Sequence, residues 1–302
     1  MRMQPTLVKI SVATDAIDAA VVTKDEAVIR FVKRSKLPIY ALAAFGDSSN
    51  DLPFLELNGL LFVGCPANAQ TRVKTALARK KNGFISTSPY LDGFMDFYER
   101  AAALGARVVV SDRDGVLLSE TGEIDESRIC GLLGHIGINN QPMLKILTGS
   151  SYSQNAKLLV DSGIPEVAAN NPALVSDPFL ILAENGSVPI NVITREQRLD
   201  VDIAALEPTI QLMRGRFLRA LIEELKRSVL GCFGLELTCD ANHRADKVYI
   251  PQKDTMVTVD VPRVCGADTR FRTSPESDLF RDAVVEAMRK CAKASGLPIH
   301  LI

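Results

Sequence analysis

Short, uninterrupted apolar runs alternate with amphipathic segments over the first two thirds of the chain. Such runs, bounded by proline, glycine or polar residues, occupy residues 38–46, 58–66 and 143–149, and residues 178–190 hold a fourth predicted strand followed by an Asn-Gly turn at 185–186. A continuous apolar run is typical of a strand that is buried on both faces. Residues 23–34 predict a helix with a capping box made by Thr23 and Glu26, and residues 92–112 predict a helix, a glycine stop and another strand. This alternation predicts an α/β fold with an open, mostly parallel sheet.

The pattern changes at about residue 191. Residues 206–231 are rich in helix formers, and residues 246–264 alternate in polarity like the strands of a hairpin. Residues 274–296 predict a capped helix, followed by a last strand at 297–302. Grouping of helices and strands in this way predicts a second domain of the α+β class.

Composition narrows the functional classes. The 302 residues are 47% hydrophobic and 24% charged, with a net charge of −1, which is typical of a globular protein and indicates neither a nucleic-acid partner nor a membrane partner. The N-terminal residues do not resemble a secretory signal. Six scattered cysteines without a C-x-x-C pair favour reduced thiols in a cytoplasmic protein, and three distant histidines argue against a zinc site.

Three predicted strands end in polar clusters, at residues 47–51, 112–114 and 148–150. Ligands of open parallel sheets bind at the carboxyl ends of the strands. These clusters are therefore the candidates for chemistry.

The cluster at 112–114 is a D-x-D-G sequence formed by Asp112, Asp114 and Gly115. Side chains two residues apart on a strand point the same way, so one carboxylate can act as a nucleophile while the other handles a proton. Repulsion between two close carboxylates is expected to raise one of their pKa values, which suits the acid–base role. The alternative is a strand that ends in two solvated aspartates.

The cluster at 47–51 places Asp47 and Asp51 across a turn, where both carboxylates can reach one ion. Oxygen ligands around a small open site suit Mg²⁺. The alternative is a turn and helix N-cap built from Ser48, Asn50 and Asp51.

Two further features concern anions. Thr148, Gly149 and Ser150 combine a hydroxyl, a flexible glycine and free N–H groups at a helix start, which predicts either an anion cradle or an ordinary N-cap. Lys24 lies at a predicted helix start, where a cation opposes the helix dipole. It is either a surface lysine or a group that neutralises a phosphate and the nucleophile together.

Four features taken together resemble the four motifs of the haloacid-dehalogenase-like phosphatases. They are D-x-D-G after a strand, T-G after a strand, a lysine at a helix start, and G-D-x-x-N-D at 46–51. The stretch around Asn185-Gly186 and the run 63–69 are similar to the branch that carries a large α/β cap (type IIB, sugar-phosphatase-like). The resemblance implies a Rossmann-like core with a parallel sheet and an α+β cap. It implies core segments at 23–104 and 105–190, and a cap made of 191–302 together with about 7–22.

The motifs occur in an unusual order, because the lysine and G-D-x-x-N-D motifs (III and IV) precede the D-x-D-G and T-G motifs (I and II). Three explanations compete: a circular permutation, a truncated domain followed by a whole one, and a homodimer in which one chain's residues 1–104 complete the site of another. Each motif occurs once and the two parts are complementary, so permutation is favoured. It predicts that the new ends lie in the cap, with the first and last strands as neighbours.

The resemblance implies roles for individual residues. Asp112 corresponds to the nucleophile, Asp114 to the general acid and base, Thr148 to a group that holds the phosphoryl oxygens, and Lys24 to a group that offsets their charge. Further phosphate contacts are implied for Gly115, Asn50, Gly149 and Ser150. Mg²⁺ is implied as the cofactor, with Asp112, the main-chain carbonyl of Asp114, and Asp47 as ligands, and with Asp51 as a ligand or an orienting group.

The sequence also departs from the family pattern. Val116 stands where threonine is common, and Arg113 replaces a usually apolar residue, most simply as a partner in a surface salt bridge. In the cap, Lys253 and Arg263 are candidate substrate contacts.

The resemblance implies a Mg²⁺-dependent phosphatase acting on a small phosphate ester, most simply a sugar phosphate. The alternatives are a phosphomutase of the same superfamily and a non-catalytic protein that binds sugar phosphates.

Overall fold

Two β-sheets organise the chain in the computed structural model, which describes residues 7–13, 16–119, 121–160, 162–243, 245–266 and 270–301. The chain divides into two compact units. One, here called the core unit, is Thr23–Asp200, and the other, here called the two-segment unit, combines Met1–Val22 with Val201–Ile302. Positions 14, 15, 120, 161, 244, 267–269 and 302 of the predicted domains lie outside the described residues.

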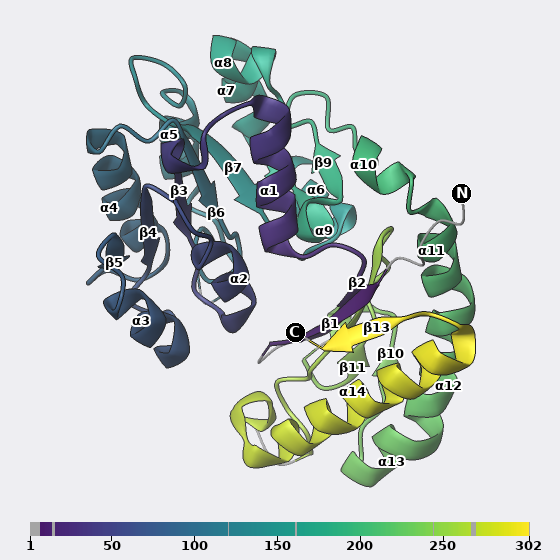
Figure 1. Ribbon diagram of the computed structural model, residues 1–302. Coiled ribbons are helices and arrows are strands. Elements are labelled where there is room, and N and C mark those ends of the chain that lie inside the picture. The colour runs from purple at the N-terminus through teal and green to yellow at the C-terminus, as the bar shows by residue number, and fades with distance from the viewer. Residues whose placement is uncertain are drawn as a thin grey trace. The chain divides into compact units, whose positions relative to one another are not determined.

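The core unit contains a seven-stranded sheet with the order β5-β4-β3-β6-β7-β8-β9 (Figure 1). All neighbouring pairs are parallel except β8 and β9. The strands are β3 (Leu42–Phe45), β4 (Phe62–Cys65), β5 (Gly83–Ile85), β6 (Val108–Ser111), β7 (Met143–Leu147), β8 (Ile181–Leu182) and β9 (Val188–Ile190). The predicted α/β class with a mostly parallel sheet is therefore confirmed.

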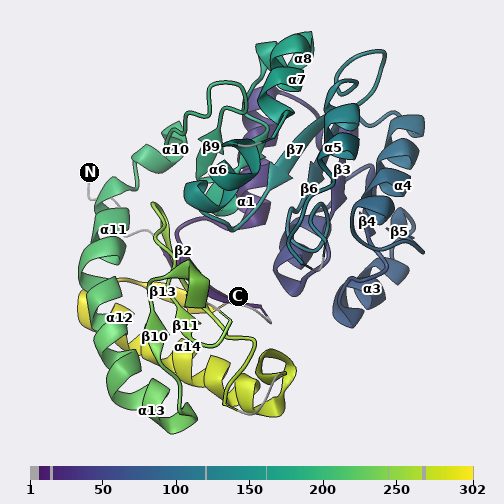
Figure 2. The same cartoon turned by 180° about the vertical axis from the view of Figure 1, so that it is seen from behind.

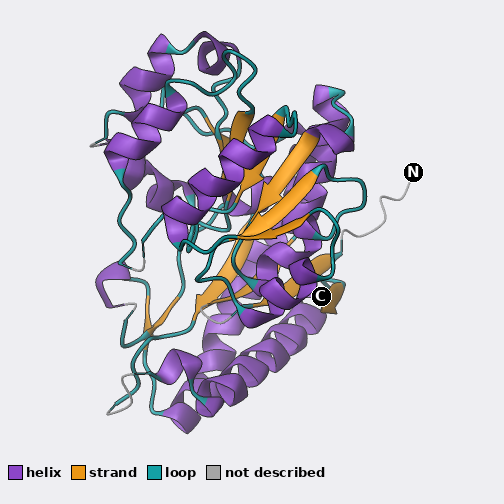
Figure 3. Ribbon diagram, turned by 90° about the vertical axis from the view of Figure 1, so that its left-hand side faces the viewer, coloured by secondary structure: helices purple, strands orange, loops and turns teal. Residues whose placement is uncertain are grey.

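Helices cover both faces of this sheet, with α1 on one face and α5 on the other (Figures 1 and 2). Alternation along β7 explains the arrangement, because Leu144 and Ile146 join the core beneath α4 and α5, whereas Lys145 faces Phe31 of α1. The strands thus lie between layers of helices (Figure 3). The helices are α1 (Lys24–Ser35), α2 (Leu52–Leu55), α3 (Thr71–Ala78), α4 (Tyr90–Ala103), α5 (Glu126–Leu133), α6 (Tyr152–Val160), α7 (Ile164–Asn170), α8 (Pro172–Ser176) and α9 (Ala183–Gly186).

Local signals locate these elements well. The capping box of α1 is present, with the N–H of Thr23 donating to Oε2 of Glu26 at 3.1 Å. The predicted strand at 38–46 is shorter than expected, because a 3₁₀ turn at Ile39–Ala41 precedes it and extended pairing starts at Leu42. Continuous apolar character marks burial, and the backbone pairing decides where the strand itself begins.

The two-segment unit contains a six-stranded sheet with the order β10-β11-β12-β2-β1-β13. Its strands are β1 (Val8–Val12), β2 (Ala16–Ala20), β10 (Leu237–Thr238), β11 (Val248–Tyr249), β12 (Met256–Asp260) and β13 (Ile299–Leu301). Its helices are α10 (Val201–Ala204), α11 (Glu207–Leu212), α12 (Leu218–Glu224), α13 (Leu230–Phe233) and α14 (Pro275–Ser295), with π-helical turns at Met213–Phe217 and Leu225–Val229. The antiparallel pairing of β11 with β12 confirms the predicted hairpin-like strands.

The first and last strands of the described chain are direct neighbours in this sheet. β1 pairs in parallel with β13, with Val8 opposite Ile299, and the N–H of Val8 donates to the carbonyl of Pro298 at 2.8 Å. This confirms the prediction that the two end segments supply adjacent strands. None of the helices in the described part of the chain combines the length and the apolar composition that a bilayer crossing requires.

Shortening Ile17 to alanine is expected to destabilise the two-segment unit, because this residue is fully buried in β2 between β1 and β12. The expected loss is about 2–5 kcal/mol of the free energy of unfolding. Urea denaturation followed by circular dichroism measures it. Leu279→Ala on α14 removes the same kind of side chain from a position that is 64% exposed, and this control should change stability by less than about 0.5 kcal/mol. Equal effects of the two substitutions would contradict the assigned role of β2.

Candidate functional site

The parallel pairing of β3 with β6 brings two of the predicted clusters together. Phe45 lies opposite Ser111 in the sheet, and the N–H of Asp112 donates to the carbonyl of Phe45 at 2.9 Å. The loops that leave these two strands therefore start side by side. Carboxylate oxygens of Asp47, Asp51 and Asp112 all lie within 4.8 Å of one another. One chain by itself assembles this acidic cluster, without a segment from a second copy.

Two glycines make room for the acidic cluster. Gly115 has a φ of +71°, and a Cβ there would lie 2.3 Å from Oδ2 of Asp47. A Cβ at Gly46 would lie 2.6 Å from Cβ of Asp51. Because both distances are shorter than any van der Waals contact, the approach of the two loops requires glycine at position 115, and the tight turn at 46–51 requires glycine at position 46.

Lys24, the first residue of α1, is buried and donates to two members of the cluster. Its Nζ lies 2.6 Å from Oδ1 of Asp51 and 2.9 Å from Oδ1 of Asp112. Burial by itself would lower the pKa of Lys24, but the charges of Asp112 and Asp51 outweigh burial and raise this pKa. The interpretation of Lys24 as a surface lysine is therefore wrong.

Asp51 is fully buried, and hydrogen bonds occupy both of its carboxylate oxygens. Oδ1 accepts from Lys24, while Oδ2 accepts from the N–H groups of Asp47 and Ser48, both at 3.0 Å, and from Oγ of Ser48 at 3.1 Å. This geometry is that of a residue that orients Lys24 and the turn at 47–51. Within the described residues, Asp112 differs, because its Oδ2 accepts no hydrogen bond.

The pKa of Asp112 is raised above its usual range. Burial is the main cause, the charges of Asp51 and Asp114 add to it, and Lys24 opposes it. The pKa of Asp114 moves the other way: desolvation by the surrounding protein would raise it, although half of this side chain is exposed, and the guanidinium of Arg113 and the other donors around the carboxylate lower it. The expected rise in one member of the pair thus falls on Asp112, the predicted nucleophile, and not on Asp114, the predicted acid–base group.

The loop after β7 contacts Asp114. Thr148 is fully buried, and its Oγ1 lies 3.2 Å from Oδ2 of Asp114, while Oγ of Ser150 lies 3.3 Å from the same oxygen. The N–H of Ser150, which was expected to be free for an anion, instead donates to Oγ1 of Thr148 at 3.1 Å. The hydroxyl of Thr148 thereby tightens the turn at Gly149, and the hydroxyls of Thr148 and Ser150 both donate to the carboxylate of Asp114.

Arg113 does not form the surface salt bridge that the sequence predicted, because its side chain is buried. It is 6% exposed, and its Nη2 lies 2.8 Å from Oδ1 of Asp114 and 2.6 Å from Oγ of Ser150. Its Nη1 donates to Oδ1 of the fully buried Asn155 at 2.8 Å. Only the Asp114 end of this ion pair reaches solvent, since that side chain is 52% exposed.

The remaining predicted residues lie outside this network. Asn50 is half-buried in the 3₁₀ turn Ser49–Asp51. Lys253 and Arg263 belong to the two-segment unit. Lys253 is buried, donates to Oγ1 of Thr258 and lies 3.8 Å from Oδ1 of Asp18, so its ammonium is already paired inside that unit. Arg263 is exposed.

Two asparagines that sequence reasoning missed support the loops. Asn68 donates from Nδ2 to the carbonyl of Gly115 at 2.8 Å, and its Oδ1 accepts from the N–H of Tyr90 at 2.8 Å. Nδ2 of Asn155 donates to the carbonyl of Ser151 at 2.7 Å. A polar residue in a loop or on an amphipathic helix gives no local sign of burial. Of the two asparagines, only Asn68 lies in a stretch that sequence reasoning singled out, the run 63–69.

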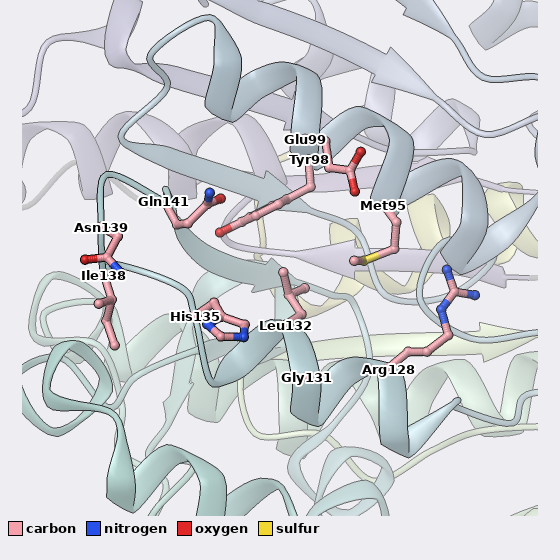
Figure 4. Close-up of a pocket in the computed structure, with 10 residues that line it drawn as sticks. All are labelled: Met95, Tyr98, Glu99, Arg128, Gly131, Leu132, His135, Ile138, Asn139 and Gln141. Carbon is pink, nitrogen blue, oxygen red and sulfur yellow. The ribbon is translucent and has the colours of Figure 1, made fainter.

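A cavity of about 510 Å³ lies elsewhere in the core unit, between α4 and α5 (Figure 4). Its lining includes the buried Tyr98 and Leu132 and the exposed Glu99, Arg128 and His135. None of the predicted site residues lines it, and its charged side chains are exposed. The buried charges around Asp112 are therefore the stronger candidate for chemistry.

Comparisons of the chain with protein-family models, with curated proteins and with solved structures found no match.

Replacing Lys24 with methionine is expected to lower the free energy of unfolding by about 3–5 kcal/mol at pH 8 without divalent cations, because buried carboxylates lose their partner. The loss should be smaller at pH 5. Lys24 lowers the pKa of Asp112, so without Lys24 this pKa in the folded protein rises further. A carboxyl with a raised pKa in the folded state binds a proton more readily when folded, so lowering the pH stabilises the variant more than the wild type. Urea titrations at both pH values measure the effect. Lys33→Met, an exposed lysine of the same helix, is the control, and equal losses in the two variants would contradict this account.

Proposed function

We propose that this protein is a Mg²⁺-dependent phosphatase that hydrolyses a small phosphorylated metabolite, most simply a sugar phosphate, through an aspartyl-phosphate on Asp112. The observation that carries the proposal is that the carboxylates of Asp51 and Asp112 both accept from the ammonium group of Lys24, which lies 88 residues from Asp112 in sequence. The resemblance of the surrounding motifs to the haloacid-dehalogenase-like phosphatases gives these residues their roles.

The donor set suits Mg²⁺. Two oxygens that bind one Mg²⁺ ion at ~2.1 Å are at most ~4.2 Å apart, and the acidic cluster approaches this spacing, with one carboxylate oxygen from each of its three residues within 4.8 Å of the other two. Asp47 and Asp112 would hold the ion, together with the main-chain carbonyl of Asp114. Asp51 would orient them, because its oxygens are already hydrogen-bonded. When bound, the ion would neutralise the oxygens of the substrate phosphate.

The first half of the reaction uses Asp112 as a nucleophile. Its carboxylate attacks phosphorus, an Asp112–phosphate bond forms, and the bond from phosphorus to the leaving oxygen breaks. Lys24, Thr148 and Ser150 hold the phosphoryl oxygens during this transfer. Asp114, after it takes up a proton in the presence of the bound phosphate, gives that proton to the leaving oxygen.

The second half regenerates the protein. Asp114, now ionised, takes a proton from a water molecule that attacks phosphorus, and inorganic phosphate leaves as the carboxylate of Asp112 is restored. Arg113 and the hydroxyls around Asp114 favour this ionised form.

A circular permutation of the family fold accounts for the motif order. The core sheet pairs β3 with β6 through main-chain hydrogen bonds that do not depend on which strand comes first in the chain. The adjacent β1 and β13 agree with new chain ends placed in a cap.

Mg²⁺ is expected to stabilise the wild-type protein by about 2.7 kcal/mol at a free concentration of 100 times its Kd, because it binds only the folded chain. Asp47→Asn should remove most of this stabilisation. Urea titrations with and without Mg²⁺ measure it by circular dichroism, since the chain has no tryptophan. Asp92→Asn, at an exposed position of the same unit, is the matched control. An unchanged response to Mg²⁺ in Asp47→Asn would place the metal elsewhere.

A phosphate-release screen over sugar phosphates and other small phosphate esters with Mg²⁺ tests the activity directly. The wild type should release inorganic phosphate without any added bisphosphate, which separates a phosphatase from a phosphomutase. Asp112→Asn should lower kcat by at least about 1,000-fold, whereas Asp92→Asn should retain it. Turnover that survives in Asp112→Asn, or a wild type with no substrate in the screen, would count against the proposal.

A further inference from the structure

Arg113 joins the two loops that carry the proposed acid–base group and the proposed phosphate donors. Its guanidinium makes three contacts with the carboxylate of Asp114: Nε to Oδ2 at 3.2 Å, and Nη2 to Oδ1 and Oδ2 at 2.8 and 3.0 Å. Nη2 also donates to Oγ of Ser150 at 2.6 Å. A planar fork of donors is the group suited to grip a carboxylate at both oxygens.

The other side of the guanidinium is anchored in the interior. Nη1 donates to Oδ1 of Asn155, and Nδ2 of Asn155 donates to the carbonyls of Ser150 at 3.3 Å and Ser151 at 2.7 Å. Asn155 is fully buried and Arg113 is 6% exposed. The arginine is therefore held in place by α6 and by the loop after β7, independently of Asp114.

Asp114 has the opposite character, because its side chain is 52% exposed. A half-exposed carboxylate at a loop has little packing to select one rotamer, and its freedom of rotation must be restricted for it to act at a defined atom. The contacts from Arg113, Thr148 and Ser150 supply that restriction from one side.

We infer that Arg113 is a positioning residue, which clamps the carboxylate of Asp114 against Thr148 and Ser150 and so ties the acid–base group to the phosphate-binding loop. The inference rests on the proposed phosphatase activity. Arg113 acts through Asp114, so its removal should impair the step that needs a proton on the leaving oxygen more than it impairs substrate binding.

Two substrates of different leaving-group strength separate positioning from a general loss of structure. With the best alkyl phosphate from the screen, Arg113→Met should lower kcat by about 100-fold or more while KM changes by less than about threefold. With 4-nitrophenyl phosphate, whose leaving group departs without a proton, the loss should be less than about tenfold. The ratio of alkyl to aryl turnover should therefore fall by at least about tenfold, whereas a merely structural role would lower both rates alike.

Arg113→Lys and Arg128→Met complete the set. Lysine keeps the charge but has no fork, so Arg113→Lys should restore only part of the ratio, and it decides the question if the methionine variant does not fold. Arg128, an exposed arginine paired with Asp92, serves as the matched control and should keep the wild-type ratio. An unchanged alkyl-to-aryl ratio in folded Arg113 variants would overturn the inference while leaving the phosphatase proposal intact.

A crystal structure of Arg113→Met, or of Arg113→Lys if that is the variant that folds, gives a readout that does not depend on turnover. Asp114 should leave its 3.2 Å contact with Thr148 and adopt another rotamer or several. An Asp114 that keeps this contact would show that Thr148 and Ser150 suffice to position it. If the wild type releases no phosphate from any ester, the proposed function fails, and the structure of the variant still tests the clamp.

Discussion

The ammonium of Lys24 shared between Asp51 and Asp112 is the contact on which the site depends. Three segments meet there: the first turn of α1, the turn after β3 and the loop after β6. Each carboxylate is buried, and a buried charge is tolerated only when it is paired and hydrogen-bonded. The lysine therefore holds together groups that would otherwise repel one another, and it places an ammonium beside the carboxylate proposed to attack phosphorus.

The sheet makes this contact geometrically possible. Parallel pairing sets the carboxyl ends of β3 and β6 at the same edge, and the loops that follow can approach because Gly115 carries no side chain. Hydrogen bonds from the backbone and from Ser48 then fix Asp51 in the turn. The site is thus built mainly from backbone geometry at strand ends, with few long side chains.

The two-segment unit shows how little a sheet depends on chain order. β1 and β13 come from opposite ends of the described chain, yet they pair in register, because a ladder needs only extended backbones side by side. The same property lets β3 pair in parallel with β6 in the core unit, although two other strands, β4 and β5, come between them in the chain.

Sequence reasoning located features whose causes are local. The apolar runs marked the strands, Thr23 and Glu26 marked the start of α1, and Asn185 with Gly186 marked the turn between β8 and β9. Continuous hydrophobicity, a capping pair and a turn dipeptide each act within a few residues. The spacing of Asp112 and Asp114 likewise identified a strand end that carries two carboxylates.

Only the tertiary structure decided which charges are buried and which partner each one has. The same kinds of residue, an arginine beside an aspartate and a lysine at a helix start, occur on exposed surfaces in most sequences. Arg113 is held in the interior by Asn155, which lies 42 residues further along the chain on helix α6. Lys253 is paired because Asp18, on a different strand of the two-segment unit, lies 3.8 Å from it. Burial and pairing depend on contacts between distant segments, and the local sequence pattern does not contain that information.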